Sequence, residues 1–366
     1  MIVGVPKEIK IDEYRVAMLP IGVQLLVGAG HGVLIQKGAG IASGYDDAAY
    51  AAAGATLVET ADEIYGQAEL VVKVKEPQPG EIEKLRPGQV VFCFFHFAGS
   101  HSLTELCLNR GISAVAYETL ADDGGGLPLL APMSEVAGKL SIQEGAKCLE
   151  TPMMGRGVLL GGVVGVEPAG VLIIGGGVVG TNAARVAAGL GARVMIMDIN
   201  LARLRYLAEV LPPNVTTVYC DDHAVQRHLG AVDLVIGAVL NPGGKAPVII
   251  KRTMLSLMKK GAVLVDVSID QGGCFESSHP TTHREPVFVE EGVIHYCVTN
   301  MPAAVGRTSS KALCNATLPY ISELANCGLE SFIEKSKGLA AALNLHEGKI
   351  LCSAVAEAFP DLPSAL

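Results

Sequence analysis

The sequence carries little charge and has no strongly basic stretch. Only 18% of its 366 residues are Asp, Glu, Lys or Arg, and the formal net charge at pH 7 is −9. A nucleic-acid footprint needs Lys and Arg gathered in a stripe that displaces counterions from phosphates, so nucleic acid is not an expected partner. Half of the residues are hydrophobic, which is typical of parallel sheets covered on both faces by helices.

The sequence also lacks the marks of secretion and of membrane insertion. The first ten residues, MIVGVPKEIK, contain no basic segment followed by an apolar one, so they do not resemble a signal peptide. The longest apolar tract begins at residue 157, but it is rich in glycine and is interrupted by Glu167 and Pro168. Such a tract is not typical of a membrane-spanning helix. We therefore expect a cytoplasmic protein with no membrane partner.

Cysteine pairs are absent as well. The nine cysteines are an odd number and none of them forms a CxxC pair, which indicates reduced thiols rather than disulfides. Most lie in apolar segments such as VVFCFF, where a free cysteine behaves as a small hydrophobic residue. We expect no bound metal. Cys274, which follows two glycines, is the one thiol for which a reactive role stays open.

What the sequence does contain is a regular alternation of short Val, Ile and Leu runs with helical segments. This pattern is typical of βα units and a parallel sheet. The length predicts two domains, because single hydrophobic cores rarely grow past about 250 to 300 residues. We predict an α/β protein of two Rossmann-like, doubly wound parallel-sheet domains with a cleft between them.

The expected elements follow from these runs. A helix is predicted at 102–111, with Ser102 as its N-cap and Gly111 as its C-cap. Another is predicted at 20–30. The expected strands lie at 2–6, 32–36, 70–75, 89–95 and 112–118, and then at 170–177, 193–199, 214–220, 233–239, 262–268 and 293–299.

Two features of the sequence indicate where the domains divide. The glycine-rich loop ADDGGGLP ends at residue 128, and such composition favours an exposed crossing between cores. After NMPAAVGRTSS the chain becomes helical, over a stretch long enough to run back to the first domain. We therefore expect a discontinuous substrate-binding and catalytic domain made of 1–128 and 308–366, and a second domain at 129–307.

The clearest motif lies in the second domain. Gly175, Gly177 and Gly180 form G-x-G-x-x-G directly after an apolar strand. The first glycine permits the tight turn, the second lets a pyrophosphate approach the backbone, and the third lets helix and strand pack closely. A diphosphate would then lie at the helix N-terminus, where unpaired N–H groups and the helix dipole favour negative charge. The alternative is a glycine turn of purely structural use.

An acid follows the motif at the spacing that dinucleotide binding requires. Asp198 ends the next strand, where it can accept hydrogen bonds from a ribose and would repel a 2′-phosphate. Arg203 and Arg205 favour the opposite choice of cofactor, NADP, since they could neutralise that phosphate. The acid at the strand end favours NAD as the cofactor over NADP.

In the first domain, polar side chains stand at the ends of apolar strands. Lys75 ends LVVKVKEP, whose alternation puts it on the same face as Lys73. His96 ends the strand VVFCFFHF. Ligands bind at the carboxyl ends of such strands, so a cation and an imidazole there indicate a substrate site. Taken alone, His96 would more readily be explained as a histidine of the core.

Arg15 lies in the loop after the first strand. Its guanidinium could grip a carboxylate with two hydrogen bonds, which a small acid substrate would require. A surface arginine paired with Glu13 or Asp12 is an equally open alternative.

The stretch LVDVSIDQGGCFE contains two acids in an apolar surrounding. Asp266 lies within the strand and is expected to bind neighbouring loops. Asp270 lies past the strand end, just before Gly272 and Gly273. We expect its carboxylate to lie beside the nicotinamide and to face His96 across the cleft.

Segments along nearly the whole chain resemble the alanine dehydrogenases, whose family includes the NAD-binding part of the proton-translocating transhydrogenases. The resemblance rests on VGVPKEIK, EYRVAMLP, KVKEP, LPLLAPMSEVAGKLS, LVDVSIDQGGCFE and NMPAAV, among others. It implies NAD-dependent, reversible oxidative deamination of L-alanine to pyruvate and ammonia. It also implies a homo-oligomer that is usually a hexamer.

The resemblance assigns roles to individual residues. It implies that Arg15 and Lys75 bind the substrate, and that His96 and Asp270 form the catalytic acid/base pair. Two positions depart from the family pattern, since Cys220 stands where a serine is usual and His279 where Arg or Lys is common. The implied cofactor contacts, besides the glycine motif, are Ser134, Val178, Asp198, Arg203, Cys220, Val239, Leu240, Val267, Ser268, Ile269, Asp270, Val298, Asn300 and Met301.

Three other hypotheses fit parts of the sequence. A transhydrogenase-like NAD-binding subunit would pass hydride to a partner chain and would not need Lys75 and His96 together. A catalytically silent NAD sensor would not need Arg15, Lys75, His96 and Asp270 intact. A related dehydrogenase acting on lysine or saccharopine would need room and a counter-charge for a long side chain.

Overall fold

The computed structural model describes residues 1–239, 241 and 244–366. The chain divides into two compact units. The first unit consists mainly of Met1–Met133 and Pro302–Leu366, and the second mainly of Ser134–Asn241 and Lys245–Met301. Each unit is described by itself below.

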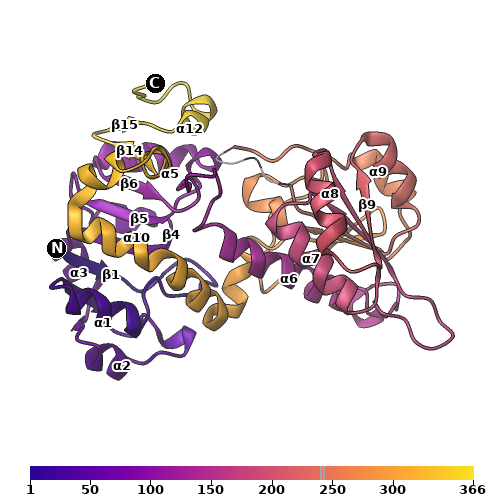
Figure 1. The fold of residues 1–366 in the computed structure, drawn as a ribbon, viewed down its shortest axis with the longest axis horizontal. Coiled ribbons are helices and arrows are strands. Elements are labelled where there is room, and N and C mark those ends of the chain that lie inside the picture. The colour runs from indigo at the N-terminus through magenta and orange to yellow at the C-terminus, as the bar shows by residue number, and fades with distance from the viewer. Residues whose placement is uncertain (240, 242–243) are drawn as a thin grey trace. The chain divides into compact units, whose positions relative to one another are not determined.

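The first unit is built on an eight-stranded sheet (Figure 1). Its strand order is β15-β14-β6-β5-β4-β1-β2-β3, and the six strands from β1 to β6 run parallel. Their order is therefore 3-2-1-4-5-6, that of a dinucleotide-binding sheet. The strands are β1 (Ile2–Val5), β2 (Gly32–Gln36), β3 (Thr56–Val58), β4 (Leu70–Lys75), β5 (Val90–Phe94), β6 (Ser113–Ala116), and the antiparallel β14 (Leu343–His346) and β15 (Lys349–Ile350).

The helices of the first unit follow its strands in the βα order that the sequence predicts. The longest, α10, spans Gly306–Glu334 and contains a non-helical residue at Gly328. The others are α1 (Pro20–Gly28), α2 (Asp47–Ala52), α3 (Ala61–Gln67), α4 (Pro79–Ile82), α5 (His101–Arg110), α11 (Lys337–Ala340) and α12 (Ser353–Ala358), with short 3-10 turns η1 (Ile41–Ser43) and η2 (Phe97–Gly99).

One predicted helix cap is wrong and its counterpart is confirmed. Helix α5 begins one residue after Ser100, whose hydroxyl accepts the N–H of Leu103, so Ser100 and not Ser102 is the N-cap. Both serines precede the same apolar run, and only the backbone conformation at Ser100 distinguishes them. Gly111 is the C-cap, with φ of 68°, a left-handed conformation that glycine adopts without steric cost.

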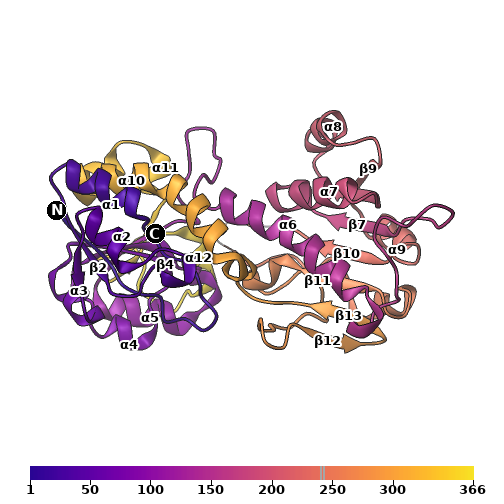
Figure 2. The ribbon, with the colours of Figure 1, turned by 90° about the horizontal axis from the view of Figure 1, so that it is seen from below.

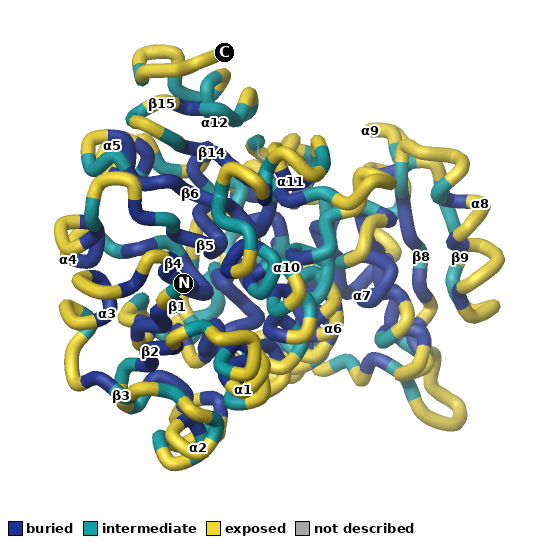
Figure 3. Tube along the Cα trace, turned by 60° about the vertical axis from the view of Figure 1, so that its left-hand side comes forward, coloured by how far each residue is buried: buried dark blue, intermediate teal, exposed yellow. Residues whose placement is uncertain are grey.

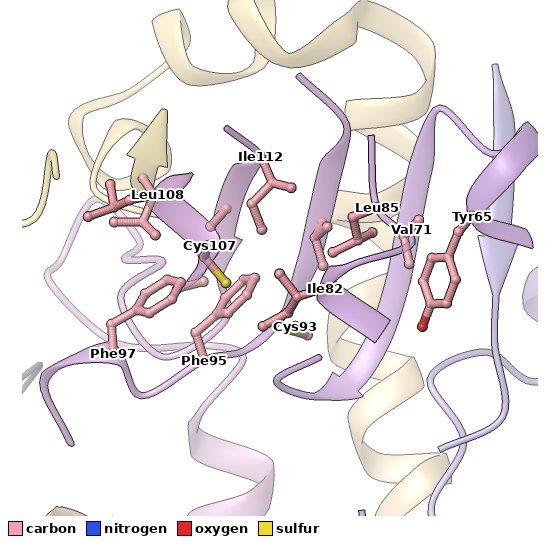
Figure 4. Packing of buried hydrophobic residues seen from close by; sticks show 14 of the residues in the cluster. Tyr65, Val71, Ile82, Leu85, Cys93, Phe95, Phe97, Cys107, Leu108 and Ile112 are labelled. Carbon is pink, nitrogen blue, oxygen red and sulfur yellow. The ribbon is translucent and has the colours of Figure 1, made fainter. Parts of the chain in front are cut away.

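The core of the first unit lies between the sheet and its flanking helices. Figure 4 shows Phe95, Phe97, Cys107 and Leu108 packed together, with Ile112 close by, and all five are nearly inaccessible to solvent. All six residues of β4 are buried. Apolar side chains buried on both faces are typical of a parallel sheet covered by helices.

The second unit has a seven-stranded sheet of order β12-β13-β11-β10-β7-β8-β9. Figure 2 shows β7, β10, β11, β13 and β12 next to one another. All strands but the antiparallel edge strand β12 run parallel, so the order is again 3-2-1-4-5-6. They are β7 (Gly170–Ile174), β8 (Arg193–Asp198), β9 (Val215–Tyr219), β10 (Leu234–Gly237), β11 (Val263–Asp266), β12 (Val287–Glu290) and β13 (Val293–Tyr296).

The remaining helices belong wholly or mainly to the second unit. They are α6 (Ala131–Cys148), α7 (Val178–Gly189), α8 (Leu201–Val210) and α9 (Asp222–Leu229), with the 3-10 turns η3 (Thr151–Met153), η4 (Arg252–Leu257) and η5 (Val267–Gln271). The 3-10 turn η6 (Met301–Val305) lies at the boundary and belongs mainly to the first unit. Figure 3 shows that β8 is largely buried, whereas α8 and α9 carry exposed surfaces.

The predicted fold class is confirmed, because both units are α/β with predominantly parallel, doubly wound sheets. The strands that the sequence did not predict are β3, β12, β14 and β15, which have four residues or fewer and lie at or beside the sheet edges. Such short strands have too few residues to show a period of two. Among the described residues, no helix is long and apolar enough to cross a membrane.

The nine cysteines are free thiols, and six of them are buried. Cys274, the thiol whose role stayed open, is fully buried and its S–H donates to Asp266 at 3.5 Å. Burial raises the pKa of Cys274 well above its ordinary value. Because the thiolate is the reactive form, this environment disfavours a nucleophilic role.

Candidate functional site

The three glycines of the G-x-G-x-x-G motif meet different steric limits. Gly175 has φ of 107°, and a Cβ there would lie 2.3 Å from the carbonyl oxygen of Ala238. At Gly180 a Cβ would lie 1.8 Å from the carbonyl oxygen of Gly175, which is the close packing of helix on strand predicted from the sequence. A Cβ on Gly177 would meet nothing within 4 Å. The backbone is thus closely packed at Gly175 and Gly180 and open at Gly177, where a pyrophosphate would approach.

Helix α7 begins directly at this turn. Gly177 is its N-cap and provides no side chain to bind the first N–H groups of the helix. Val178, the first helical residue, is 39% exposed. An uncapped helix N-terminus of this kind presents N–H groups and a positive dipole end to an anion.

Asp198 and Arg203 hold the glycine turn from both sides. The Asp198 carboxylate accepts the N–H of Gly176 at 2.7 Å and that of Asn200 at 2.8 Å. The Nε of Arg203 donates to the carbonyl oxygen of Gly176 at 2.6 Å, and its Nη2 donates to the Thr181 hydroxyl at 2.8 Å. Both polar groups of the Gly176 residue are therefore bound by side chains. The sequence showed the acid and the arginine but not this bracing role.

The guanidinium of Arg203 also lies over an aromatic ring. Its central carbon is 4.9 Å from the centroid of the Tyr206 ring, within the range of a cation–π interaction. Arg203 belongs to α8, and the bonds of its Nε and Nη2 to the glycine turn hold its side chain against the start of α7.

The other predicted cofactor contacts of the second unit follow the carboxyl ends of its strands. Val239 follows β10, the stretch 267–270 forms η5 after β11, and 298–301 follows β13. The Ser268 hydroxyl donates to the carbonyl oxygen of Val239 at 2.7 Å, which joins two of these segments. Ligands of doubly wound sheets bind at this edge.

Four further positions complete the prediction. The N–H of Cys220 donates to the carbonyl oxygen of Asp198 at 3.0 Å, so Cys220 lies beside the predicted adenosine-binding acid. Ser134 belongs to α6, and His279 stacks on Phe288 with ring centroids 3.7 Å apart. Leu240 lies outside the described residues.

The two acids of the stretch that ends β11 have different environments. Asp266 is fully buried and accepts hydrogen bonds from the N–H groups of Ser268, Cys274 and Phe275 and from the Ser278 hydroxyl. Burial raises the pKa of Asp266, although these hydrogen bonds oppose the shift. The structural role predicted for Asp266 is confirmed by these contacts. Asp270 lies beyond the strand, in η5, and is exposed.

In the first unit, Lys75 ends β4 beside β1, which is the switch point of this sheet. The pairing of β4 with β5 is irregular there, because Val72 lies opposite Phe92 and Lys75 opposite Phe94. One extra residue on β4 makes this a bulge. The Glu8 carboxylate, which follows β1, accepts the N–H of Val74 within the bulge at 2.6 Å. Lys75 is only 4% exposed.

The bulge also separates Lys75 from Lys73. Lys73 is fully buried and donates to Glu8 at 3.1 Å and to Glu81 at 2.9 Å, while the Tyr65 hydroxyl donates to Glu81 at 2.6 Å. Burial alone would lower the pKa of Lys73, but the two carboxylates raise it overall. The prediction that both lysines share a face assumed unbroken alternation, and the pairing of β4 with β5 is irregular between Val72 and Lys75.

Arg15 is paired with Glu13, as one of the two sequence hypotheses had it, but it is not on the surface. Its Nε and Nη2 donate to the two carboxylate oxygens of Glu13 at 2.7 and 2.5 Å, and its Nη1 lies 3.2 Å from the Met133 sulfur. Arg15 is 3% exposed. The Glu13 carboxylate therefore orients the guanidinium of Arg15 through its Nε and Nη2.

His96 follows β5 in an unusual backbone conformation. Its φ and ψ are 53° and 43°, a left-handed conformation that costs a non-glycine residue about 1 to 2 kcal/mol. The Glu118 carboxylate accepts the N–H of His96 at 2.6 Å and that of Phe95 at 3.2 Å. The imidazole is half-buried and stacks on Phe94 with centroids 5.8 Å apart. Sequence reasoning singled out His96 but did not predict its contact with Glu118, which lies 22 residues away in the chain.

The described part of the chain offers no cluster of three or more His, Cys, Asp or Glu side chains that could hold a metal ion.

Comparisons with known proteins place this geometry in a family. Residues 4–137 match the family model described as alanine dehydrogenase/PNT, N-terminal domain, and residues 141–353 match the corresponding C-terminal domain. The chain is 52% identical to a protein of Halomonas elongata named alanine dehydrogenase, over 98% of this chain and 97% of that one. A Bacillus subtilis protein of the same name is 47% identical, over 97% of this chain and 94% of that one.

Solved structures agree with these matches. A structure titled L-alanine dehydrogenase has a TM-score of 0.92 and 47% identity, and the match covers 99% of each chain. A transhydrogenase structure from Sinorhizobium meliloti has a TM-score of 0.79 at 24% identity, covering 97% of this chain and all of that one, and so shares the fold. On both the sequence and the structural matches, the chain belongs to the alanine dehydrogenase/PNT family.

Proposed function

We propose that this protein is an NAD-dependent alanine dehydrogenase, which oxidises L-alanine to pyruvate and ammonia in a reversible reaction. The observation that carries the proposal is the identity of about half of all residues, over nearly the full length, with proteins of that name. The glycine turn and the strand-end polar residues of the two units support it, because the reaction needs both a dinucleotide and an amino-acid substrate.

The second unit is proposed to bind NAD. The diphosphate would lie against the open side of Gly177 at the N-terminus of α7, and Asp198 would accept hydrogen bonds from the adenosine ribose. Asp198 disfavours a 2′-phosphate. The guanidinium of Arg203 is bound to Gly176 and Thr181 at the glycine turn and is not positioned to bind that phosphate. NAD supplies the hydride acceptor, and the remaining chemistry falls to the chain's own residues.

Arg15 and Lys75 are proposed to bind the substrate. The Arg15 guanidinium, oriented by Glu13, would pair with the α-carboxylate. Lys75, at the switch point of the first sheet, would polarise the oxygen that develops at the α-carbon as a fixed positive charge. Burial of both cations strengthens their interaction with the carboxylate and the developing oxygen of the substrate, because the local dielectric is lower than in water.

His96 and Asp270 are proposed to transfer protons. Loss of a hydride from the α-carbon and of a proton from the ammonium group of L-alanine leaves an iminium to which water adds, and the resulting carbinolamine must lose ammonia. These steps require a group that takes a proton from water and returns one to the amine. An imidazole, whose ordinary pKa is about 6.5, can do both near neutral pH, and a carboxylate can assist it.

The cellular setting of the enzyme is also part of the proposal. We propose a cytoplasmic homohexamer, on the resemblance to the alanine dehydrogenases and on the free thiols of all nine cysteines, which suit a reducing compartment. Mass measurement of the native protein in solution tests the subunit number.

One assay tests the proposed reaction. NADH formation is followed with a panel of L-amino acids, and each reaction is repeated with NADP in place of NAD. We expect L-alanine with NAD to give the highest kcat/KM. If no amino acid supports NADH formation although NADH binds, the chain is instead a nucleotide-binding subunit without an organic substrate of its own.

A further inference from the structure

The backbone ladder between β5 and β6 ends just before His96. The two strands pair in parallel with Cys93 opposite Ala116, and the N–H of Tyr117 donates to the carbonyl oxygen of Cys93 at 2.9 Å. Continued by two residues, this register brings Glu118 opposite Phe95. At that point a side chain takes the place of the backbone partner, since the Glu118 carboxylate accepts the N–H groups of Phe95 and His96.

The Glu118 carboxylate is well placed to hold this turn. Glu118 is 6% exposed, and its Oε1 accepts from both His96 and Phe95, while its Oε2 accepts from Phe95 at 3.3 Å. Hydrogen bonds to an ionised acceptor are shorter and stronger than neutral ones, and the contact to His96 is 2.6 Å. A buried carboxylate bound to two successive N–H groups restricts the backbone at both residues.

The direction of the His96 side chain depends on that restriction. His96 has left-handed φ and ψ, which a histidine avoids unless its surroundings impose them. Extended backbone at this position would send the imidazole along the alternation of the strand instead. The short hydrogen bond from the His96 N–H to Glu118 therefore favours the observed backbone conformation.

We propose that Glu118 is a positioning residue of the reaction, which fixes the backbone of His96 and so aims its imidazole at the substrate. This inference rests on the proposed function, because it matters only if His96 transfers protons. A proton-transferring group must lie within hydrogen-bond reach of the proton it takes, and small displacements of such groups reduce turnover strongly. Glu118 itself touches backbone N–H groups and acts through His96.

A graded series at this position tests the proposal. Glu118→Gln keeps one oxygen acceptor but loses the charge and the second acceptor, and Glu118→Ala removes both. We expect kcat to fall roughly 10-fold in Glu118→Gln and roughly 100-fold in Glu118→Ala. The KM for NAD should change less than about twofold, because the glycine turn is untouched. A kcat within about twofold of the parent chain in Glu118→Ala would overturn the proposal, as would a loss confined to KM for NAD.

A matched control separates positioning from loss of stability. Asp233 is also 6% exposed and also accepts a backbone N–H at the end of a strand, that of Gly170 at 3.0 Å, but at the amino end of β7 in the second unit. Asp233→Asn is expected to lower the thermal midpoint and to leave kcat unchanged at a temperature where the protein is folded. If Glu118→Ala does not fold, Glu118→Gln and Glu118→Asp carry the comparison. An equal loss of kcat in Asp233→Asn would overturn the proposal.

A double-mutant cycle shows whether Glu118 acts through His96. Residual turnover of His96→Ala is measured at high enzyme concentration, with and without Glu118→Gln. We expect Glu118→Gln to add no further loss, because the group that it positions is gone. A further 10-fold loss would contradict positioning through His96. Full turnover in His96→Ala would instead remove His96 from the mechanism, which is a failure of the proposed function that this cycle distinguishes.

Discussion

The two sheets have the same strand order and different chemistry at their carboxyl ends. In the second unit, the first turn of the sheet is made of glycines, and beside it lie the uncapped N-terminus of α7 and one acid, Asp198. In the first unit, the same edge carries the buried cations Arg15 and Lys75 and the acids Glu13, Glu8 and Glu118. The shared strand order therefore places the carboxyl ends of the strands in the same way in both sheets. The residues that follow each strand decide which ligand can bind at those ends.

The difference extends to how each edge is held in place. Close packing fixes the glycine turn, since a Cβ on Gly175 or Gly180 would collide with backbone. Carboxylates fix the edge of the first unit, where Glu8 binds the bulge of β4 and Glu118 binds the turn at His96. The glycine turn of the second unit should thus be disrupted by added side-chain volume, and the strand ends of the first unit by the loss of a carboxylate charge.

Removing the groups that are proposed to transfer protons, one in each unit, should have the largest effect. We expect His96→Ala and Asp270→Ala each to lower turnover at least 10²- to 10⁴-fold, because a positioned acid or base contributes about that factor. Binding of NADH, followed by fluorescence, should remain nearly intact. Tight NADH binding together with undiminished turnover would remove that residue from the mechanism.

Asp266 is the matched control for Asp270. Asp266→Asn should lower the thermal midpoint, because the buried Asp266 carboxylate accepts four N–H or O–H groups from three neighbouring segments. Asp270→Asn should leave that midpoint close to the parent value, since Asp270 is exposed. The reverse order of the two midpoints would contradict the division of roles.

Added side-chain volume at the glycine turn should disrupt the packing of the second unit and its proposed NADH site. Gly180→Ala should destabilise the fold by about 3 kcal/mol and weaken NADH binding, because its Cβ would lie 1.8 Å from the Gly175 oxygen. Gly177→Ala should leave the free energy of unfolding unchanged, since nothing lies within 4 Å of its Cβ, but should still weaken NADH binding. Urea unfolding and NADH titration measure the two effects. Equal destabilisation by both substitutions would contradict the steric assignment.

In the first unit, loss of the buried charge of Glu8 should disrupt the carboxyl end of β4 instead. Glu8→Gln should lower the free energy of unfolding by about 2 to 3 kcal/mol, because Glu8 binds both the buried Lys73 and the N–H of Val74. It should also raise the KM for L-alanine through the displaced Lys75, while NADH affinity stays constant. Glu59→Gln, at an exposed ion pair with Lys37, is the control and should change neither quantity. A raised KM for NAD with an unchanged KM for L-alanine would show that Glu8 does not act on Lys75.

The smallest expected effect concerns pH and lies in the second unit. Burial lowers the pKa of His295 to about 4, and its ring contacts Ser277 at 2.8 Å and the carbonyl oxygen of Val293 at 3.0 Å. The unfolded chain binds this proton near pH 6.5 and the folded chain only near pH 4. The free energy of unfolding should thus fall by about 2 kcal/mol between pH 7 and pH 5 through this group alone.

His295→Asn isolates that contribution. The variant should lose about that much less stability than the parent chain over the same pH interval, which urea unfolding at the two pH values measures. An identical pH dependence in both proteins would show that His295 is not the group responsible.

Much of the fold could be read from the sequence because the signals are local. The longer strands are runs of five or six mainly apolar residues, and the glycine motif gives its spacing within six residues. The strands β14 and β15 were missed because two to four residues carry no period, and the true N-cap at Ser100 was missed because only its backbone conformation distinguishes it from Ser102. The roles of Arg15, Lys75, His96 and Asp270 were read from strand ends and from resemblance, and they stay predictions until the variants are measured.

What the sequence by itself determined is the type and order of elements, because hydrophobic periodicity and turn residues act over a few neighbours. Only the tertiary structure decided which side chains hold the two edges. Glu8 meets Val74 across 66 positions and Glu118 meets His96 across 22, so no local pattern reports either contact. These carboxylates are buried among N–H groups that parallel strands leave without partners at their ends, and that need arises only once the sheet has formed.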